Sequence, residues 1–183
     1  RYVVDMNECH TLIPEIGFKI DALRALITSL EAYKNIAQIE VAQGSKDTAL
    51  IFRNLIELSP IDIQKLKAFG ALHHFKIYLQ PKGPDSIYPI FPEDTSMMMK
   101  YTLDGLDFDF HPAGFIQVNS TINERMIAKS MELLNLQESD HVLDLFCGIG
   151  NFTLPIAKRV QQVIGIEGCQ QSVNMGKHNA TIN

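Results

Sequence analysis

The sequence predicts an α/β protein in which an α+β domain is followed by the first βαβ unit of a nucleotide-type binding fold. Near the C-terminus an apolar run leads into a turn with two glycines, then a helical stretch, and then a second apolar run ending in an acid; these features are 142–145, Gly148, Gly150, 163–166 and Glu167. This order is typical of such a unit. The pattern changes after His111-Pro112. We therefore expect two domains, 1–110 and 111–183.

Composition indicates a soluble globular protein, since 46% of the 183 residues are hydrophobic and 20% are charged. No apolar run reaches the roughly 18 residues of a membrane span, and the N-terminus lacks a signal-peptide pattern. The three cysteines form no CxxC pair, and an odd number disfavours a disulfide framework. We expect a cytoplasmic protein with no membrane partner.

The net charge is −5, so the composition has no excess of basic residues that could neutralise phosphates. This argues mildly against RNA or DNA binding by this part of the protein. The chain begins with Arg1 and ends inside an apparent helix. We therefore expect it to be a fragment of a longer protein, in which a basic surface could lie elsewhere.

Apolar spacing predicts the elements of the first domain. Five residues recur at helical spacing and predict a helix over about 13–32: Ile16, Ile20, Leu23, Ile27 and Leu30. Ser59-Pro60 predicts the start of a helix that runs to about Phe69. Asp104-Gly105 predicts a hairpin turn. Strands are expected at 1–6, 36–42, 48–58, 75–79, 87–90, 98–103 and 106–110.

Polar residues add two local expectations. Asp107 and Asp109 alternate with apolar residues, which predicts that both lie on a solvent-exposed strand face. Residues 115–118 are expected to form a short strand before a helix, for which Thr121 and Glu124 have capping-box spacing.

The glycine turn predicts a cofactor site. Gly148 and Gly150 let the backbone approach a ligand closely, because a Cβ would intrude there. Asn151 stands where the next helix begins, among free N–H groups. A dinucleotide fingerprint would need a third glycine at the position of Thr153. The turn therefore does not match the NAD pattern.

Two carboxylates favour S-adenosylmethionine (SAM) instead. Asp144 precedes Gly148 by four residues, and the amino group of SAM is a cation that a carboxylate can hold. Glu167 lies 17 residues after Gly150 and can accept hydrogen bonds from both ribose hydroxyls. The sequence has no GxxxxGK[ST], so triphosphate hydrolysis is not supported. The plainer alternative is an α/β domain with a tight turn and an incidental glutamate.

Three motifs, FIQVN (115–119), DLFCGIGNFTLPIA (144–157) and IGIEG (164–168), resemble those of bacterial 5-methyluridine RNA methyltransferases. These motifs are most similar to those of the branch that methylates C5 of a uridine in 23S rRNA. The resemblance covers the whole chain and is more specific over 115–183. It implies part of an iron–sulfur and RNA-binding central domain, followed by the N-terminal part of a Rossmann-like SAM-dependent methyltransferase domain. It also implies 23S rRNA as the partner.

The resemblance implies roles for individual residues. The SAM-binding positions of the family motifs correspond to Gln117, Phe146, Asn151 and Glu167. Phe115 would lie near the flipped target uracil, where a ring can stack on the base. Cys9, in VDMNECHTL, would be the last of four cysteines that hold a [4Fe–4S] cluster, the other three lying upstream.

The resemblance places no catalytic residue in this chain. The family's nucleophilic cysteine and general base would lie beyond Asn183, and Cys147 would not replace them, so the chain alone is expected to be inactive. In the parent enzyme a thiolate would add to C6 of uracil, C5 would attack the SAM methyl group, and a base would remove the C5 proton. The alternatives are a tRNA or another rRNA uridine as substrate, and a non-catalytic RNA-binding or scaffold piece.

Overall fold

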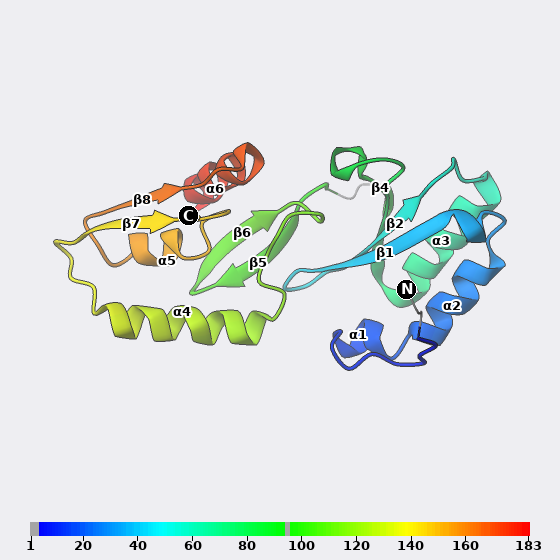
Figure 1. The fold of residues 1–183 in the computed structure, drawn as a ribbon, viewed down its shortest axis with the longest axis horizontal. Helices are drawn as coiled ribbons and strands as arrows, with labels where there is room; N and C mark the ends of the chain where they lie inside the picture. The colour runs from blue at the N-terminus through cyan, green and yellow to red at the C-terminus, as the bar shows by residue number, and fades with distance from the viewer. Residues whose placement is uncertain (1–3, 94–95) are drawn as a thin grey trace. The chain divides into compact units, whose positions relative to one another are not determined.

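A computed structural model describes residues 4–93 and 96–183. The chain divides into two compact units, the first made of residues 4–41 and 49–93 and the second of 42–48 and 96–183 (Figure 1). Within the described residues, no helix is both long and apolar enough to cross a membrane. The hairpin at 99–110, which the sequence assigned to the first domain, belongs to the second unit.

The first unit packs helices against a four-stranded sheet of order β1-β2-β3-β4. Its elements are α1 (Pro14–Gly17), α2 (Ile20–Ser29), the 3-10 turn η1 (Tyr33–Asn35), β1 (Ile36–Gln43), β2 (Thr48–Asn54), α3 (Pro60–His73), β3 (Phe75–Leu79), η2 (Pro84–Ser86) and β4 (Tyr88–Phe91). The core joins Ile16, Phe52, Leu66 and Ile77, all fully buried. Burial of this apolar surface stabilises the unit.

Helix boundaries in the first unit differ from the sequence expectation near two glycines. The predicted helix over about 13–32 is split into α1 and α2, and at the end of α1 the carbonyl oxygen of Gly17 accepts from the backbone N–H of Cys9 at 2.9 Å. A Cβ on Gly17 would lie 2.3 Å from the carbonyl oxygen of Cys9. Helix α3 continues past Gly70, where a Cβ would lie 2.7 Å from the Ile77 side chain. Both glycines permit close packing between neighbouring segments of the chain.

Other boundaries are partly confirmed. Ser59 caps α3 as predicted, its hydroxyl oxygen accepting from the backbone N–H of Asp62 at 3.3 Å. Strand β2 ends at Asn54, earlier than the predicted 58. Part of the strand expected at 1–6 lies outside the described residues, and residues 4–6 form no strand.

The second unit contains two two-stranded sheets and three helices. Its elements are β5 (Met99–Leu103), β6 (Leu106–Phe110), α4 (Ser120–Leu134), β7 (His141–Leu145), α5 (Thr153–Ala157), β8 (Gln162–Ile166) and α6 (Gln170–Ile182). Figure 1 shows the β5–β6 hairpin between α4 and α6. Ile127 of α4 packs with Phe108 of the hairpin, and Leu154 of α5 packs against the same cluster. The hairpin is therefore a base for the elements around the glycine turn.

The entry into α4 differs from the prediction. Residues 115–118 form no strand. The helix begins at Ser120 and is capped by Asn119, whose Oδ1 accepts from the N–H of Ile122 at 3.0 Å. The capping box at Thr121 was wrong because the stronger asparagine cap lies two residues earlier.

Candidate cofactor site

The glycine turn connects parallel strands through a backbone with three left-handed residues. Strands β7 and β8 pair in parallel, with Asp144 opposite Gly165. The φ angles of Phe146, Gly148 and Gly150 are 61°, 57° and 95°. Glycine adopts this conformation without strain, whereas a phenylalanine does so at a cost and persists there only when the surroundings hold it.

The strained residue presents an aromatic ring to solvent. Phe146 is 89% exposed, although aromatic side chains are usually placed so that they bury their apolar area. Strained backbone in an exposed position is a feature of binding sites. Phe146, for which the family resemblance implies a role in SAM binding, thus has both a left-handed backbone and an exposed ring.

Glu167 is tied to the glycine turn from the end of β8. Its Oε2 accepts from the backbone N–H of Gly148 at 3.0 Å, and its Oε1 accepts from that of Cys169 at 2.8 Å. These N–H groups, that of Cys169 first, lower the pKa of Glu167 below its ordinary value. The carboxylate is therefore ionised at neutral pH, and each oxygen keeps a lone pair for a further donor.

Asp144 is held by the residue that replaces the third glycine. The Thr153 hydroxyl donates to Asp144 Oδ2 at 2.6 Å. A Cβ on Gly165 of β8 would lie 2.8 Å from Cys147 Sγ and 3.2 Å from Thr153 Oγ1, so the strand can pass under the turn only as glycine. The start of α5 thus presents a carboxylate where a dinucleotide site would receive a phosphate.

The Cys147 thiol is not set up as a nucleophile. Burial raises its pKa, and the nearby Asp144 carboxylate raises it further. A thiolate is the reactive form of cysteine, and a raised pKa keeps the group protonated.

The side chain of Asn151 is engaged by protein groups. Its Oδ1 accepts from the Tyr101 hydroxyl and from Asn123 Nδ2, both at 3.0 Å, and its Nδ2 donates to Asn123 Oδ1 at 2.9 Å. Burial raises the pKa of Tyr101, which keeps this hydroxyl a donor. Asn151 therefore retains one side-chain N–H for a ligand.

Gln117 and Phe115 lie on the irregular segment before α4, and both are exposed, Phe115 to 85%. In the described ranges 4–93 and 96–183, no hydrogen bond joins either side chain to the glycine turn. The structure thus joins Glu167 to Gly148 and Asp144 to Thr153 by hydrogen bonds, whereas the two residues of the FIQVN motif have no such bond to the turn in the described residues.

Cys9 offers a single thiolate. Its Sγ lies 3.1 Å from Thr11 Oγ1, and hydrogen bonding with Thr11 lowers the pKa of the thiol. The part of the chain that the structure describes contains no group of three or more His, Cys, Asp or Glu residues placed to hold a metal. These residues do not by themselves form a site for an iron–sulfur cluster.

Sequence reasoning missed two residues that hold the turn. Asn123 is 4% exposed and pairs with Asn151, and Tyr101 reaches the same amide from β5. An asparagine on the inner side of a predicted amphipathic helix was the available signal, because a buried amide must find partners.

Comparison with known proteins agrees with this geometry. The family described as tRNA (Uracil-5-)-methyltransferase matches residues 96–183, the whole of the region that carries the site. A protein from Hahella chejuensis named 23S rRNA (uracil(1939)-C(5))-methyltransferase RlmD is 45% identical over the whole chain, which spans 42% of that relative. A relative of the same name from Acidithiobacillus ferrooxidans is also 45% identical, with 42% of its length covered.

The chain is thus similar to RNA uracil-C5 methyltransferases over its whole length, and its residues 96–183 match the family model. It spans about two fifths of the length of these relatives. The tRNA (uracil-54, C5)-methyltransferase of Pyrococcus abyssi, solved with S-adenosyl-L-homocysteine, has the same fold, with a TM-score of 0.71 at 20% identity, over the whole chain and 47% of that protein. An M. jannaschii tRNA m1G37 methyltransferase gives 0.57 at 14% identity, over 92% of the chain and 49% of its own length.

Proposed function

We propose that this chain carries half of a SAM site in an enzyme that methylates C5 of a uridine in 23S rRNA. The observation that carries the proposal is the Glu167 carboxylate, held ionised beside Gly148 by two backbone N–H groups. A fixed carboxylate at the end of the second strand suits two ribose hydroxyls. When bound, SAM supplies an electrophilic methyl group.

The turn favours SAM over NAD because of its charge. Asp144, fixed by Thr153, puts a negative charge at the start of α5, where it would repel a pyrophosphate and attract the amino group of SAM. Gly148 and Gly150 keep the backbone open to the ligand. Asn151 contributes its remaining N–H, and the exposed ring of Phe146 provides a surface for the adenine.

The RNA side of the site is proposed to include Gln117 and Phe115. Gln117 would add a polar contact to SAM, and the exposed ring of Phe115 would stack on a uracil that has left the RNA stack. The names of the curated relatives favour 23S rRNA. A tRNA uridine is the second candidate, favoured by the name of the matching family and by the Pyrococcus abyssi neighbour.

The thiolate that adds to C6 of uracil is proposed to lie outside this chain, as the family resemblance implies; burial and the nearby Asp144 raise the pKa of Cys147, which argues against that residue. The [4Fe–4S] cluster, with Cys9 as one ligand, and a cytoplasmic location also belong to the proposed longer enzyme. The domain division at 110/111 stays a proposal for that enzyme. On this proposal the chain alone transfers no methyl group and forms no covalent complex with RNA containing 5-fluorouridine.

Calorimetric titration of the chain with SAM, and separately with NAD, tests the cofactor. We expect binding of SAM, no response to NAD, and loss of SAM binding in Glu167→Ala. Glu138→Ala, which removes an exposed carboxylate between α4 and β7, serves as the control and should bind as wild type does. Equal affinity for SAM in both variants would contradict the assigned role of Glu167, and NAD binding would contradict the cofactor.

A further inference from the structure

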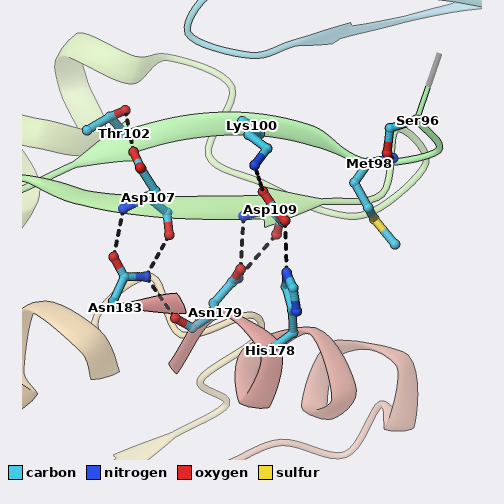
Figure 2. A network of polar contacts seen from close by, with 9 residues as sticks. All are labelled: Ser96, Met98, Lys100, Thr102, Asp107, Asp109, His178, Asn179 and Asn183. Carbon is cyan, nitrogen blue, oxygen red and sulfur yellow. Dashed lines mark hydrogen bonds and ion pairs between the residues drawn. The ribbon is translucent and has the colours of Figure 1, made fainter. Parts of the chain in front are cut away.

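Asn179 of α6 is fully buried, and its side-chain amide makes hydrogen bonds to three backbone groups. Its Oδ1 accepts from the N–H of Asp109 at 2.9 Å, and its Nδ2 donates to the carbonyl oxygen of Asp109 at 3.1 Å and to that of Ile149 at 3.2 Å. Both amide hydrogens are therefore committed. Figure 2 shows the amide of Asn179 facing Asp109 of β6.

The contact with Ile149 acts on the glycine turn directly. A peptide unit is planar, so holding the Ile149 carbonyl also orients the N–H of Gly150. That N–H donates to the carbonyl oxygen of Cys147 at 2.9 Å. The peptide between Ile149 and Gly150 is thus fixed at both ends, while Glu167 fixes Gly148 on the other side of Ile149.

The support behind Asn179 is itself fixed. Asp109 was expected on an exposed strand face, but it is 8% exposed because α6 covers it. Its Oδ2 lies 2.8 Å from His178 Nε2, and its Oδ1 lies 3.4 Å from Lys100 Nζ (Figure 2). Gly176, one turn before Asn179, also lies close to the turn, where a Cβ would be in ordinary van der Waals contact with the Gly148 carbonyl oxygen, 3.5 Å away.

We propose that Asn179 is a positioning residue for the SAM site, which sets the glycine turn in its binding conformation before the cofactor arrives. The inference rests on the proposed function. Asn179 touches no reacting group, and it acts through the Ile149 carbonyl. The turn needs such a hold because it contains a left-handed phenylalanine and two left-handed glycines, which without fixed peptide orientations would sample other conformations.

Asn183 provides a matched control one turn along α6. Its Oδ1 accepts from the N–H of Asp107 at 2.9 Å, and its Nδ2 donates to the Asp107 carbonyl oxygen at 2.7 Å, the same pattern on the same strand (Figure 2). Its remaining partner is the carbonyl oxygen of Asn179. Asn183 therefore attaches α6 to β6 without a bond to the turn.

The experiment compares Asn179→Ala with Asn183→Ala in the full chain, by calorimetric titration with SAM and by hydrogen exchange of the Gly150 amide without cofactor. We expect Asn179→Ala to weaken SAM binding by about tenfold, the effect of roughly one lost hydrogen bond, and Asn183→Ala by less than about twofold. The Gly150 amide should exchange slowly in the wild type and Asn183→Ala and faster in Asn179→Ala. Equal Kd values in the two variants would overturn the proposal.

If Asn179→Ala fails to fold, hydrogen exchange of the Gly150 amide in the wild type still tests the proposal. A Gly150 amide that exchanges freely in the cofactor-free wild type and becomes protected only with SAM would show that the turn is not set in advance. Failure of the proposed function has a different signature, because the wild type would then bind no SAM while the Gly150 amide still distinguished the two variants.

Discussion

The two units of the chain are stabilised in different ways, and the difference separates structural support from the candidate site. In the first unit, Leu50, Ile51 and Phe52 of β2 are fully buried. In the second, the four apolar residues on one face of the β7–β8 sheet are all more than half exposed: Leu143, Leu145, Ile164 and Ile166. Parallel sheets normally bury both faces. Apolar burial therefore contributes far less around the glycine turn.

Around the glycine turn of the second unit, polar contacts provide the stabilisation that apolar packing provides in the first unit. The turn is held by Glu167, Asn123 and Asn179, each through hydrogen bonds to the turn itself. Hydrogen bonds are directional, whereas apolar contacts are not. A binding turn with an unusual backbone thus gains a defined shape from a few polar residues, and each of them becomes a point where the site can be altered without removing a core side chain.

The largest effect is expected from the core of the first unit. Leu66 of α3 is fully buried, so Leu66→Ala leaves a cavity and should lower the free energy of unfolding by about 2–5 kcal/mol. Leu72→Ala on the same helix is the control, because Leu72 is 72% exposed and should change the free energy by less than about 0.5 kcal/mol. Urea denaturation measures both. Similar losses for the two variants would contradict the description of α3.

A smaller effect is expected from the bond that fixes Asp144. Thr153→Val keeps the side-chain shape and removes the hydroxyl, so the free energy of unfolding should fall by about 1 kcal/mol. SAM affinity should fall with it, because Asp144 is no longer held. Thr181→Val removes a hydroxyl that donates to an exposed carbonyl on α6 and should change neither quantity measurably. Thermal unfolding and calorimetry with both variants decide the outcome.

The pH dependence of the turn follows from Glu167. Its pKa in the folded chain is lowered, so the contribution of its two backbone bonds is complete above the ordinary glutamate pKa of about 4.3 and is lost as the pH falls through the lower folded value. The amide NMR signals of Gly148 and Cys169 should titrate together, with a midpoint below about 4.3. Glu167→Gln should remove this titration. A midpoint at the ordinary value would mean that the carboxylate is not bonded as described.

The sequence predicted the elements well where the cause of an element is local. Strands β3 and β6 have the predicted bounds because apolar residues recur within the strand itself. The break after Gly17 was not predictable in this way, since it lies where the backbone of Cys9 contacts the helix. Gly70 is a second example, because the glycine is required by the nearby Ile77 side chain and not by the helix itself.

The same distinction between local and distant causes applies to the candidate site. The motif predicted that Gly148, Asp144 and Glu167 belong together, and in the structure Glu167 bonds to Gly148 of the turn while Asp144 bonds to Thr153 at the start of α5. Asn123 and Asn179 were not predicted, because their partners lie 28 and 30 residues away in the sequence. Polar residues inside amphipathic helices, at positions where burial would be costly, are the signal to look for.

The smallest effect is expected on the open face of the β7–β8 sheet, and it tests the opening comparison most directly. Leu145 of β7 is 56% exposed, so Leu145→Ala should lower the free energy of unfolding by about 1 kcal/mol or less. Leu50→Ala in β2 is the matched variant, a fully buried strand leucine that should cost about 2–5 kcal/mol. Denaturation at two protein concentrations measures both. If Leu145→Ala costs as much as Leu50→Ala, and the cost grows with protein concentration, then self-association in solution covers this face. The difference in apolar burial between the two units would then hold only for the isolated chain.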